Sequence, residues 1–183
     1  MSSAPYITRQ RSIWRLRWKT PAGGSVIDIN RLLRRLCDAD IDFVIVGGFA
    51  ATLHGSSLVT RDLDICAILS NENVGKLRDA LRDLKPAHRL TSQKISFLDN
   101  PDPGVEVRNL YLRTDFGPVD ILSSILGVGD FDRVRSASIQ VELFERSCRV
   151  ISLDDLIRAK EALGRDKDLL AAKELRAVRE KQK

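Results

Sequence analysis

The sequence has no apolar run long enough to cross a membrane. Its first residues are basic, but no continuous apolar stretch follows them, so we expect no signal peptide. It also lacks internal repeats and low-complexity segments. These absences predict a cytoplasmic protein that does not associate with membranes.

Cysteine and histidine are scarce. The three cysteines, Cys37, Cys66 and Cys148, are widely spaced among apolar neighbours, which predicts reduced side chains in or near the core. No Cys or His spacing typical of a metal site is present. His54 stands alone at the end of a predicted helix, where a structural role is the more common one.

Acidic residues are absent from residues 1–25, although five basic residues lie there. The other 25 basic residues balance all 25 acidic ones, so the net charge of +5 belongs to this segment. With 43% apolar and 30% charged residues, the 183-residue chain has the composition of an ordinary globular domain. We therefore divide the chain into a basic arm (1–25), a core (26–125) and a C-terminal part (126–183) whose hairpin and helices pack on the core.

The arm also contains both tryptophans. As a strand, residues 13–19 would place Trp14, Leu16 and Trp18 on one face and three basic residues on the other. One interpretation is contact with RNA, through phosphates on the basic face and bases stacked on tryptophan. The alternatives are a strand packing its tryptophans on the body, or an extension without a role.

The most informative segment runs from Val44 to Ile65. An apolar run ends in Gly47-Gly48, which is typical of a buried strand that turns tightly into another element. Asp62 and Asp64 flank one apolar residue on a second predicted strand, so both carboxylates face one side, about 6.5–7 Å apart. Mg²⁺ is the natural ion between them, because it prefers a few carboxylates together with substrate phosphates.

This order of motifs resembles the polymerase-β-like nucleotidyltransferase superfamily, in which a Gly-Gly turn and short helix precede an Asp-x-Asp strand. Asp120, in a short apolar strand after Gly117-Pro118, fits the superfamily's third carboxylate. Lys160 and the segment Arg165-Asp166-Lys167-Asp168 match a C-terminal pattern of small bacterial stand-alone enzymes, including AbiEii-type toxins. The resemblance covers roughly residues 28 to 180. One departure is Leu58, where many relatives carry an arginine.

The resemblance implies an α/β (α+β) fold, with a mixed β-sheet core, flanking helices and a C-terminal helical pair. It further implies transfer of a nucleoside monophosphate from a nucleoside triphosphate to a hydroxyl of RNA or tRNA, a protein or a small molecule. Two Mg²⁺ ions, or Mn²⁺, would assist, and a cognate toxin or antitoxin is a further expected partner. A non-catalytic antitoxin or nucleotide-binding member of the same fold is the alternative.

The expected roles of the residues follow from charge. Asp62, Asp64 and Asp120 would hold the metal ions, and Asp120 would also help to deprotonate the acceptor. The nucleotide would be bound by residues of the turn, the following strand and the C-terminal segment: Gly47, Gly48, Thr60, Lys160, Arg165 and Lys167. In the alternative interpretation, these charged side chains are simply solvated.

Local patterns also predict the elements. Helices are expected from Asp28 or Asn30 to Ala39, over 48–54, from a cap at Ser70 to Pro86, from a capping box at Ser152 to Leu163, and from Asp166 onward. Strands are expected at 43–46, 63–69, 92–97, 105–113, around Asp120, at 139–144 and at 148–151, with a loop-rich stretch up to about 138.

Overall fold

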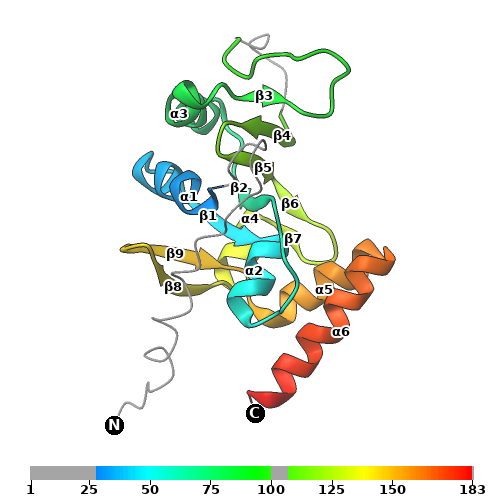
Figure 1. Cartoon of the computed structure of the whole chain (residues 1–183). Coiled ribbons are helices and arrows are strands. Elements are labelled where there is room, and N and C mark those ends of the chain that lie inside the picture. Colours follow the sequence, from blue (N-terminus) through cyan, green and yellow to red (C-terminus); the bar gives the residue numbers. More distant parts are fainter. Residues whose placement is uncertain (1–27, 100–106, 183) are drawn as a thin grey trace.

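The computed structural model describes residues 28–99 and 107–182. The predicted basic arm lies outside these ranges. A seven-stranded mixed sheet forms the centre, in the order β3-β4-β5-β2-β1-β9-β8. Figure 1 shows α1 and α3 to the left of the central strands, whereas α2, α5 and α6 lie to their lower right. This is the mixed α/β architecture that the sequence predicts.

The strands are β1 (Phe43–Val46), β2 (Leu63–Ala67), β3 (Ala87–His88), β4 (Asn109–Thr114), β5 (Gly117–Leu122), β6 (Ser124–Ile125), β7 (Gly129–Asp130), β8 (Ile139–Leu143) and β9 (Arg146–Val150). The helices are α1 (Ile29–Asp38), α2 (Gly47–His54), α3 (Asn71–Leu81), the 3-10 helix η2 (Arg82–Leu84), α4 (Phe131–Ser136), α5 (Leu153–Leu163) and α6 (Asp166–Lys181).

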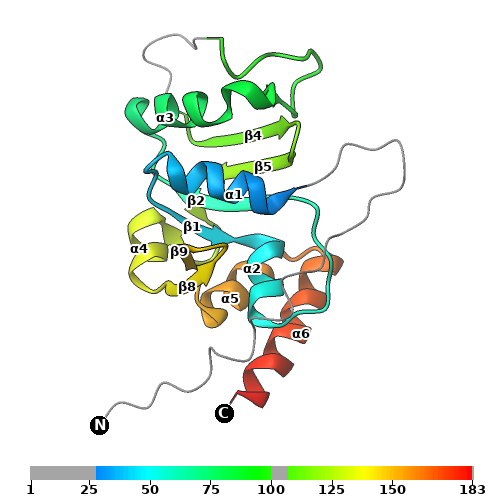
Figure 2. The same cartoon turned by 60° about the vertical axis from the view of Figure 1, so that its left-hand side comes forward.

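The middle strands of the sheet have one face made of fully buried apolar side chains. β2 pairs antiparallel with β1 and parallel with β5. Leu63 and Ile65 of β2 are fully buried, together with Val119 and Ile121 of β5. Because side chains alternate along a strand, the residue between each pair points to the opposite face. The hairpin β8–β9 extends the same sheet, since β9 pairs parallel with β1 (Figure 2).

Three helices begin at the caps that the sequence predicts. Asp28, Ser70 and Ser152 each accept a hydrogen bond from the backbone N–H three residues later, at 3.0, 3.2 and 3.3 Å. Such a bond satisfies a backbone donor that has no partner within the helix. The cap of α1 is therefore Asp28, the first of the two predicted candidates.

The strand predicted at residues 92–97 is wrong. The partner of β4 is instead β3, and only one isolated bridge joins Ser96 to Ala87. Residues 91–95 are exposed and only Phe97 is buried, so the segment lacks the alternating burial that holds a strand in register. Part of the second strand of that predicted pair, residues 105–106, lies outside the described ranges.

The stretch predicted as loop-rich, up to about residue 138, contains the β6–β7 hairpin and the short helix α4. Phe131 and Val134 anchor α4 in the core, and Asp130 caps it by accepting a 3.0 Å hydrogen bond from the Arg133 N–H. Two buried residues are too few to produce a helical period that stands out in the sequence.

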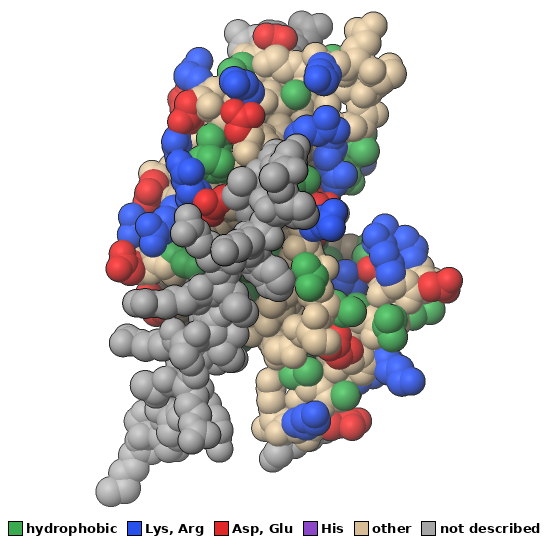
Figure 3. All heavy atoms as spheres, viewed as in Figure 1, with side chains coloured by type: hydrophobic (Ala, Val, Ile, Leu, Met, Phe, Trp, Pro, Cys, Tyr) green, Lys and Arg blue, Asp and Glu red, His purple; other side chains and the backbone are tan. Residues whose placement is uncertain are grey.

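Charges of both signs are mixed over one face of the described residues. Figure 3 shows acidic and basic side chains interspersed over the visible face rather than gathered by sign. The described body therefore presents no single-sign field on this face.

Candidate active site

The three predicted carboxylates lie at one end of two neighbouring parallel strands. Asp64 of β2 stands opposite Asp120 of β5 in the sheet register. Adjacent strands are about 4.8 Å apart, so both carboxylates leave the same face side by side. Asp62 immediately precedes β2, two residues before Asp64. The strand register therefore brings together acids that lie far apart in the sequence.

The glycine turn packs against the acid row, the name used here for Asp62, Asp64 and Asp120. Gly47 has φ +63°, and a Cβ there would lie 1.9 Å from Asp64 Oδ2. A Cβ on Gly48 would lie 2.6 Å from Thr60 Oγ1. The Gly48 N–H donates a 3.4 Å hydrogen bond to Asp64 Oδ2. Only glycine allows both the positive φ and this close approach, so the pair sets the N-terminus of α2 against Asp64.

Arg89, just after β3, is a member of the site that the sequence interpretation missed. Its Nε donates a 3.0 Å hydrogen bond to Asp120 Oδ1, its Nη2 bonds Asp120 Oδ2, and the same Nη2 lies 4.0 Å from Asp62 Oδ2. Pairing of β3 with β4, and of β4 with β5, brings Arg89 beside Asp120. That register was the missing information, because no local motif marks Arg89.

The surroundings of Asp64 and Asp120 disfavour the charged form of both carboxyl groups. Burial raises the pKa of Asp64 to about 6, and the neighbouring Asp120 and Asp62 add to the effect, while the Gly48 N–H and Lys160 oppose it. Burial also raises the pKa of Asp120, although Arg89 works in the opposite direction. Partial burial and repulsion between neighbouring carboxylates thus act together in this cluster.

Lys160 of α5 lies near enough to the cluster for its charge to act on Asp64. Its side chain is 14% exposed, and its charge acts on Asp64, so it lies on the site side of the helix. The Nζ donates a 2.9 Å hydrogen bond to Asp168 Oδ1 at the start of α6. Arg165 Nε donates a 2.5 Å bond to the other oxygen of the same carboxylate. Burial would raise the pKa of Asp168, but these two cations outweigh it and hold that pKa below its usual range.

The remaining predicted residues have different surroundings. Thr60 shapes the turn before β2, because its Oγ1 bonds the Asp62 carbonyl at 3.3 Å and accepts from the Asp62 N–H at 3.4 Å. The Lys167 side chain is exposed. His54 bonds the carbonyl of Ile151 through Nε2 at 2.8 Å, which fits the structural role expected for it.

The donor chemistry fits an oxygen-ligated divalent ion at two of the acids. Within residues 28–99 and 107–182, no three His, Cys, Asp or Glu side chains converge as ligands of one ion. Asp120 is instead paired with Arg89. Mg²⁺ commonly takes one or two carboxylates together with substrate phosphates. Asp62 and Asp64 can supply the carboxylates. The predicted metal site, with Asp62, Asp64 and Asp120 as ligands, stays a prediction.

Comparison with known proteins supports the fold. No family model matches the sequence, and curated proteins give no match. Among solved structures, the chain is similar to the lincosamide antibiotic adenylyltransferase LnuA in its lincomycin-bound form. The TM-score is 0.54 at 14% identity, over 85% of this chain and 99% of LnuA. It is also similar to an antigenic nucleotidyltransferase-like protein from Paracoccidioides brasiliensis. There the TM-score is 0.50 at 15% identity, over 82% and 73% of the two chains.

The chain therefore has the nucleotidyltransferase fold, and its structural neighbours are nucleotidyltransferases. The fold predicted from the motifs is confirmed, while membership of the superfamily and the AbiEii type stay predictions. None of the helices in the described ranges is both long and apolar enough to span a membrane.

Proposed function

We propose that this protein is a Mg²⁺-dependent nucleotidyltransferase, which moves a nucleoside monophosphate from a nucleoside triphosphate to a hydroxyl group. The observation that carries the proposal is the register of Asp64 with Asp120, with the Gly47-Gly48 turn against Asp64. Lys160 adds a positive charge close to the same carboxylate. Acids for a metal ion and donors for phosphate thus meet at one end of the sheet.

The reaction assigns one task to each group. The acceptor oxygen bonds to the α-phosphorus, the bond from phosphorus to the bridging oxygen breaks, and pyrophosphate leaves with that electron pair. The acceptor proton passes to the carboxylate of Asp120, the acid that lies beside Asp64 in the register. Asp62 and Asp64 would hold Mg²⁺. When bound, the ion neutralises charge on the phosphate oxygens.

The phosphates would enter between the glycine turn and α5. The N–H groups at the start of α2, an eight-residue helix, produce a positive potential that suits phosphate. Lys160 and Arg165 are both oriented by Asp168. A preoriented cation loses less side-chain freedom when it binds phosphate, which favours tight binding.

One observation favours a second candidate, a non-catalytic nucleotide-binding or antitoxin-like protein. Arg89 bonds both oxygens of Asp120 and approaches Asp62, so a fixed positive charge already compensates these acids. A protein that has given up catalysis can retain its acidic row in this way. Arrangement in a toxin–antitoxin or defence system is compatible with either candidate.

The deciding experiment is transfer of label from [α-³²P]ATP in the presence of Mg²⁺. Total RNA, cell lysate and a collection of small hydroxyl compounds serve as acceptors. We expect labelled product with the wild type and a loss of at least 100-fold in the Asp62→Asn, Asp64→Asn double variant. The control is Asp79→Asn on α3, which changes an exposed acid that pairs with Arg82. Binding of Mg²⁺ and ATP without any transfer would establish the second candidate, and full transfer by the double variant would exclude the assigned site.

A further inference from the structure

A cavity of about 760 Å³ lies on the face of the sheet that carries Asp120, whose register partner Tyr111 lines it. We call it the acceptor cavity. Its floor includes Tyr111 and Asn109 of β4 and Leu122 of β5. Tyr111 stands opposite Asp120, and Asn109 stands opposite Leu122. Leu122 lies two residues after Asp120, so its side chain leaves the same face, about 6.5–7 Å further along the strand.

Contacts of Arg89 link the cavity directly to the site. Its guanidinium lies 5.7 Å from the centroid of the Tyr111 ring while it bonds Asp120. Tyr111, Arg89 and Asp120 are therefore on one face of the sheet. A ligand that rests on Tyr111 has its reactive end beside Asp120, which is where the proposed acceptor oxygen must be.

The opposite wall comes from α5 and from the segment between β6 and β7. Ala159 and Leu163 of α5 line the cavity on either side of Lys160 in sequence. Gly127, with φ +79°, lets this segment rest on α5, because a Cβ there would lie 2.6 Å from Ala162 Cβ and 3.1 Å from the Arg158 carbonyl oxygen. The cavity is thus a built space between two packed elements.

The lining chemistry favours one class of ligand. Its apolar members are Leu122, Ile125, Leu126, Val128, Ala159 and Leu163. Asn109 and Ser124 offer neutral hydrogen-bonding groups, and Asp130 is the one charged residue among the described lining. Neither Lys nor Arg lines it within residues 28–99 and 107–182. Nucleic acid is bound chiefly through basic residues that meet its phosphates, so this lining does not suit RNA.

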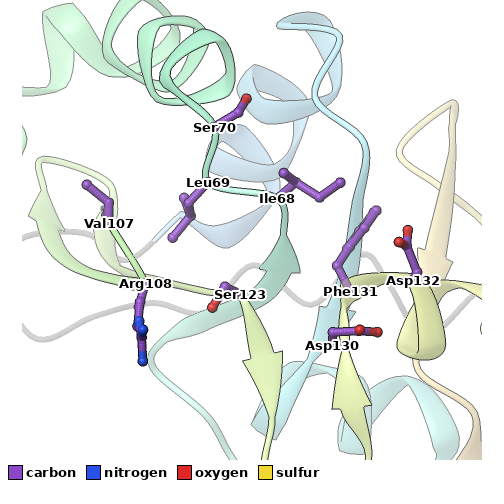
Figure 4. A pocket seen from close by; sticks show the side chains of 9 residues that line it. All are labelled: Ile68, Leu69, Ser70, Val107, Arg108, Ser123, Asp130, Phe131 and Asp132. Carbon is purple, nitrogen blue, oxygen red and sulfur yellow. The ribbon is translucent and has the colours of Figure 1, made fainter. Parts of the chain in front are cut away.

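A second, smaller cavity differs from the acceptor cavity in its lining and its position. It measures about 310 Å³, and its lining includes Arg108, Ser123, Asp130 and Asp132 (Figure 4). It lies beyond the end of β2, at Ile68 and later residues, whereas Asp64 lies at the start of that strand. Four residues of strand span about 13 Å, so this cavity does not adjoin the acid row.

We propose that the acceptor cavity binds the hydroxyl substrate, and that this substrate is a small alcohol with an apolar carbon skeleton. The inference rests on the proposed nucleotidyl transfer. A volume of 760 Å³ lies within the range of about 300–1,000 Å³ that is usual for small-molecule sites. The apolar skeleton packs against the leucines and Tyr111, and the hydroxyl faces Asp120. Asp130 makes an amine on the far part of the substrate acceptable, but an added anion unfavourable.

The test uses the full chain and two separate measurements. Calorimetric titration with ATP and Mg²⁺ reports nucleotide binding. Ligand-observed NMR reports binding of a panel of cyclic alcohols below about 500 Da, either neutral or with one amine, beside matched carboxylic acids and a 20-nucleotide RNA. Alcohols that bind are then offered as acceptors with [α-³²P]ATP.

Leu126→Asp is the test variant, because Leu126 lines the cavity and is 61% exposed, so a charge there has little effect on folding. The matched control is Leu170→Asp on α6, at a leucine that is 59% exposed and does not line the cavity. Ser124→Trp, which fills the cavity from β6, provides a second test should Leu126→Asp fold poorly.

We expect alcohols to bind the wild type and the Leu170→Asp control equally, and to bind Leu126→Asp at least tenfold more weakly. ATP affinity should stay within twofold in all three proteins. Absence of alcohol binding, equal binding by both variants, or binding of RNA in competition with the alcohols would overturn the inference. Loss of ATP binding or of transfer in the wild type, with alcohols still in the cavity, would instead overturn the proposed function.

Discussion

At the scale of single residues, burial and two acidic neighbours act together on the Asp64 carboxylate. It is partly buried, and it shares one end of the sheet with two further acids. Its pKa of about 6 lies above the ordinary value of about 3.9. The folded state therefore binds the Asp64 proton more tightly than the unfolded state does. Stability of the metal-free protein should fall as pH rises from about 4 to about 6.

We predict that Asp64→Asn stabilises the metal-free protein by about 1–2 kcal/mol at pH 8 and by much less at pH 4, because asparagine cannot acquire the unfavourable charge. Urea unfolding in the presence of a chelator, at both pH values, measures the difference. Asp79→Asn on α3, at an exposed surface pair, should show no such dependence. Equal destabilisation of the variant at both pH values would show that Asp64 stabilises the fold. It would also show that the charge of Asp64 is not disfavoured by burial and the neighbouring acids.

The sequence allows such residues to be found only where the pattern is local. Gly47 and Gly48 could be predicted because a strand that turns into a helix beside an acid requires small residues. Arg89 could not be predicted, because it reaches Asp120 only through the pairing of β3, β4 and β5. Without knowledge of this register, an arginine 31 residues from its partner is one of many basic residues.

At the scale of elements, helix starts were more predictable than strand pairs. A cap such as Ser152 and its partner N–H lie three residues apart, so the whole interaction is written in one short segment. The predicted strand at 92–97 failed because strand formation depends on a distant partner, and β4 pairs with the two-residue strand β3. The helix α4 was missed because only two of its residues are buried.

One element-level contact joins α6 to the loop that precedes the acids. Glu174 Oε2 accepts a 2.7 Å hydrogen bond from Ser56 Oγ, and Glu174 Oε1 accepts 2.7 Å bonds from the Ser57 N–H and Oγ. The side-chain and backbone bonds from Ser57, with that from Ser56, hold the pKa of Glu174 below its usual range. The C-terminal helix thus fixes the loop that leads into Thr60 and Asp62.

We predict that Glu174→Ala loosens this loop and weakens ATP binding several-fold. The variant should lose about 1–2 kcal/mol of stability, because bonds to a charged acceptor are removed together. Hydrogen exchange at the Ser57 amide is the local measurement, and it should become at least tenfold faster. Glu180→Ala, at an exposed position of the same helix, is the matched control. Unchanged exchange at Ser57 would mean that the loop is held by its own contacts rather than by α6.

At the scale of the whole molecule, the net positive charge and the proposed site residues lie in different parts of the sequence. Residues 26–183 contain equal numbers of acidic and basic residues, and the net charge of +5 comes from residues 1–25. The acid row and the acceptor cavity are built entirely from the neutral part. If the acceptor is a small apolar alcohol, the basic arm has no part in the chemistry. If the acceptor is RNA, the arm is the segment with the charge to bind it.

We predict that deletion of residues 1–25 leaves ATP affinity and transfer to small alcohols within twofold of the full chain. The five lost charges lie outside the acid row, and the remaining residues keep every side chain assigned to the site. Calorimetry with ATP and Mg²⁺, followed by label transfer at 50 and 200 mM salt, measures both quantities. A full-length variant with the five arm charges replaced by glutamine separates the effect of charge from that of chain length. A steep, salt-dependent loss of transfer to RNA in both altered proteins would contradict the prediction, because it would require the arm to bring a nucleic acid to Asp120.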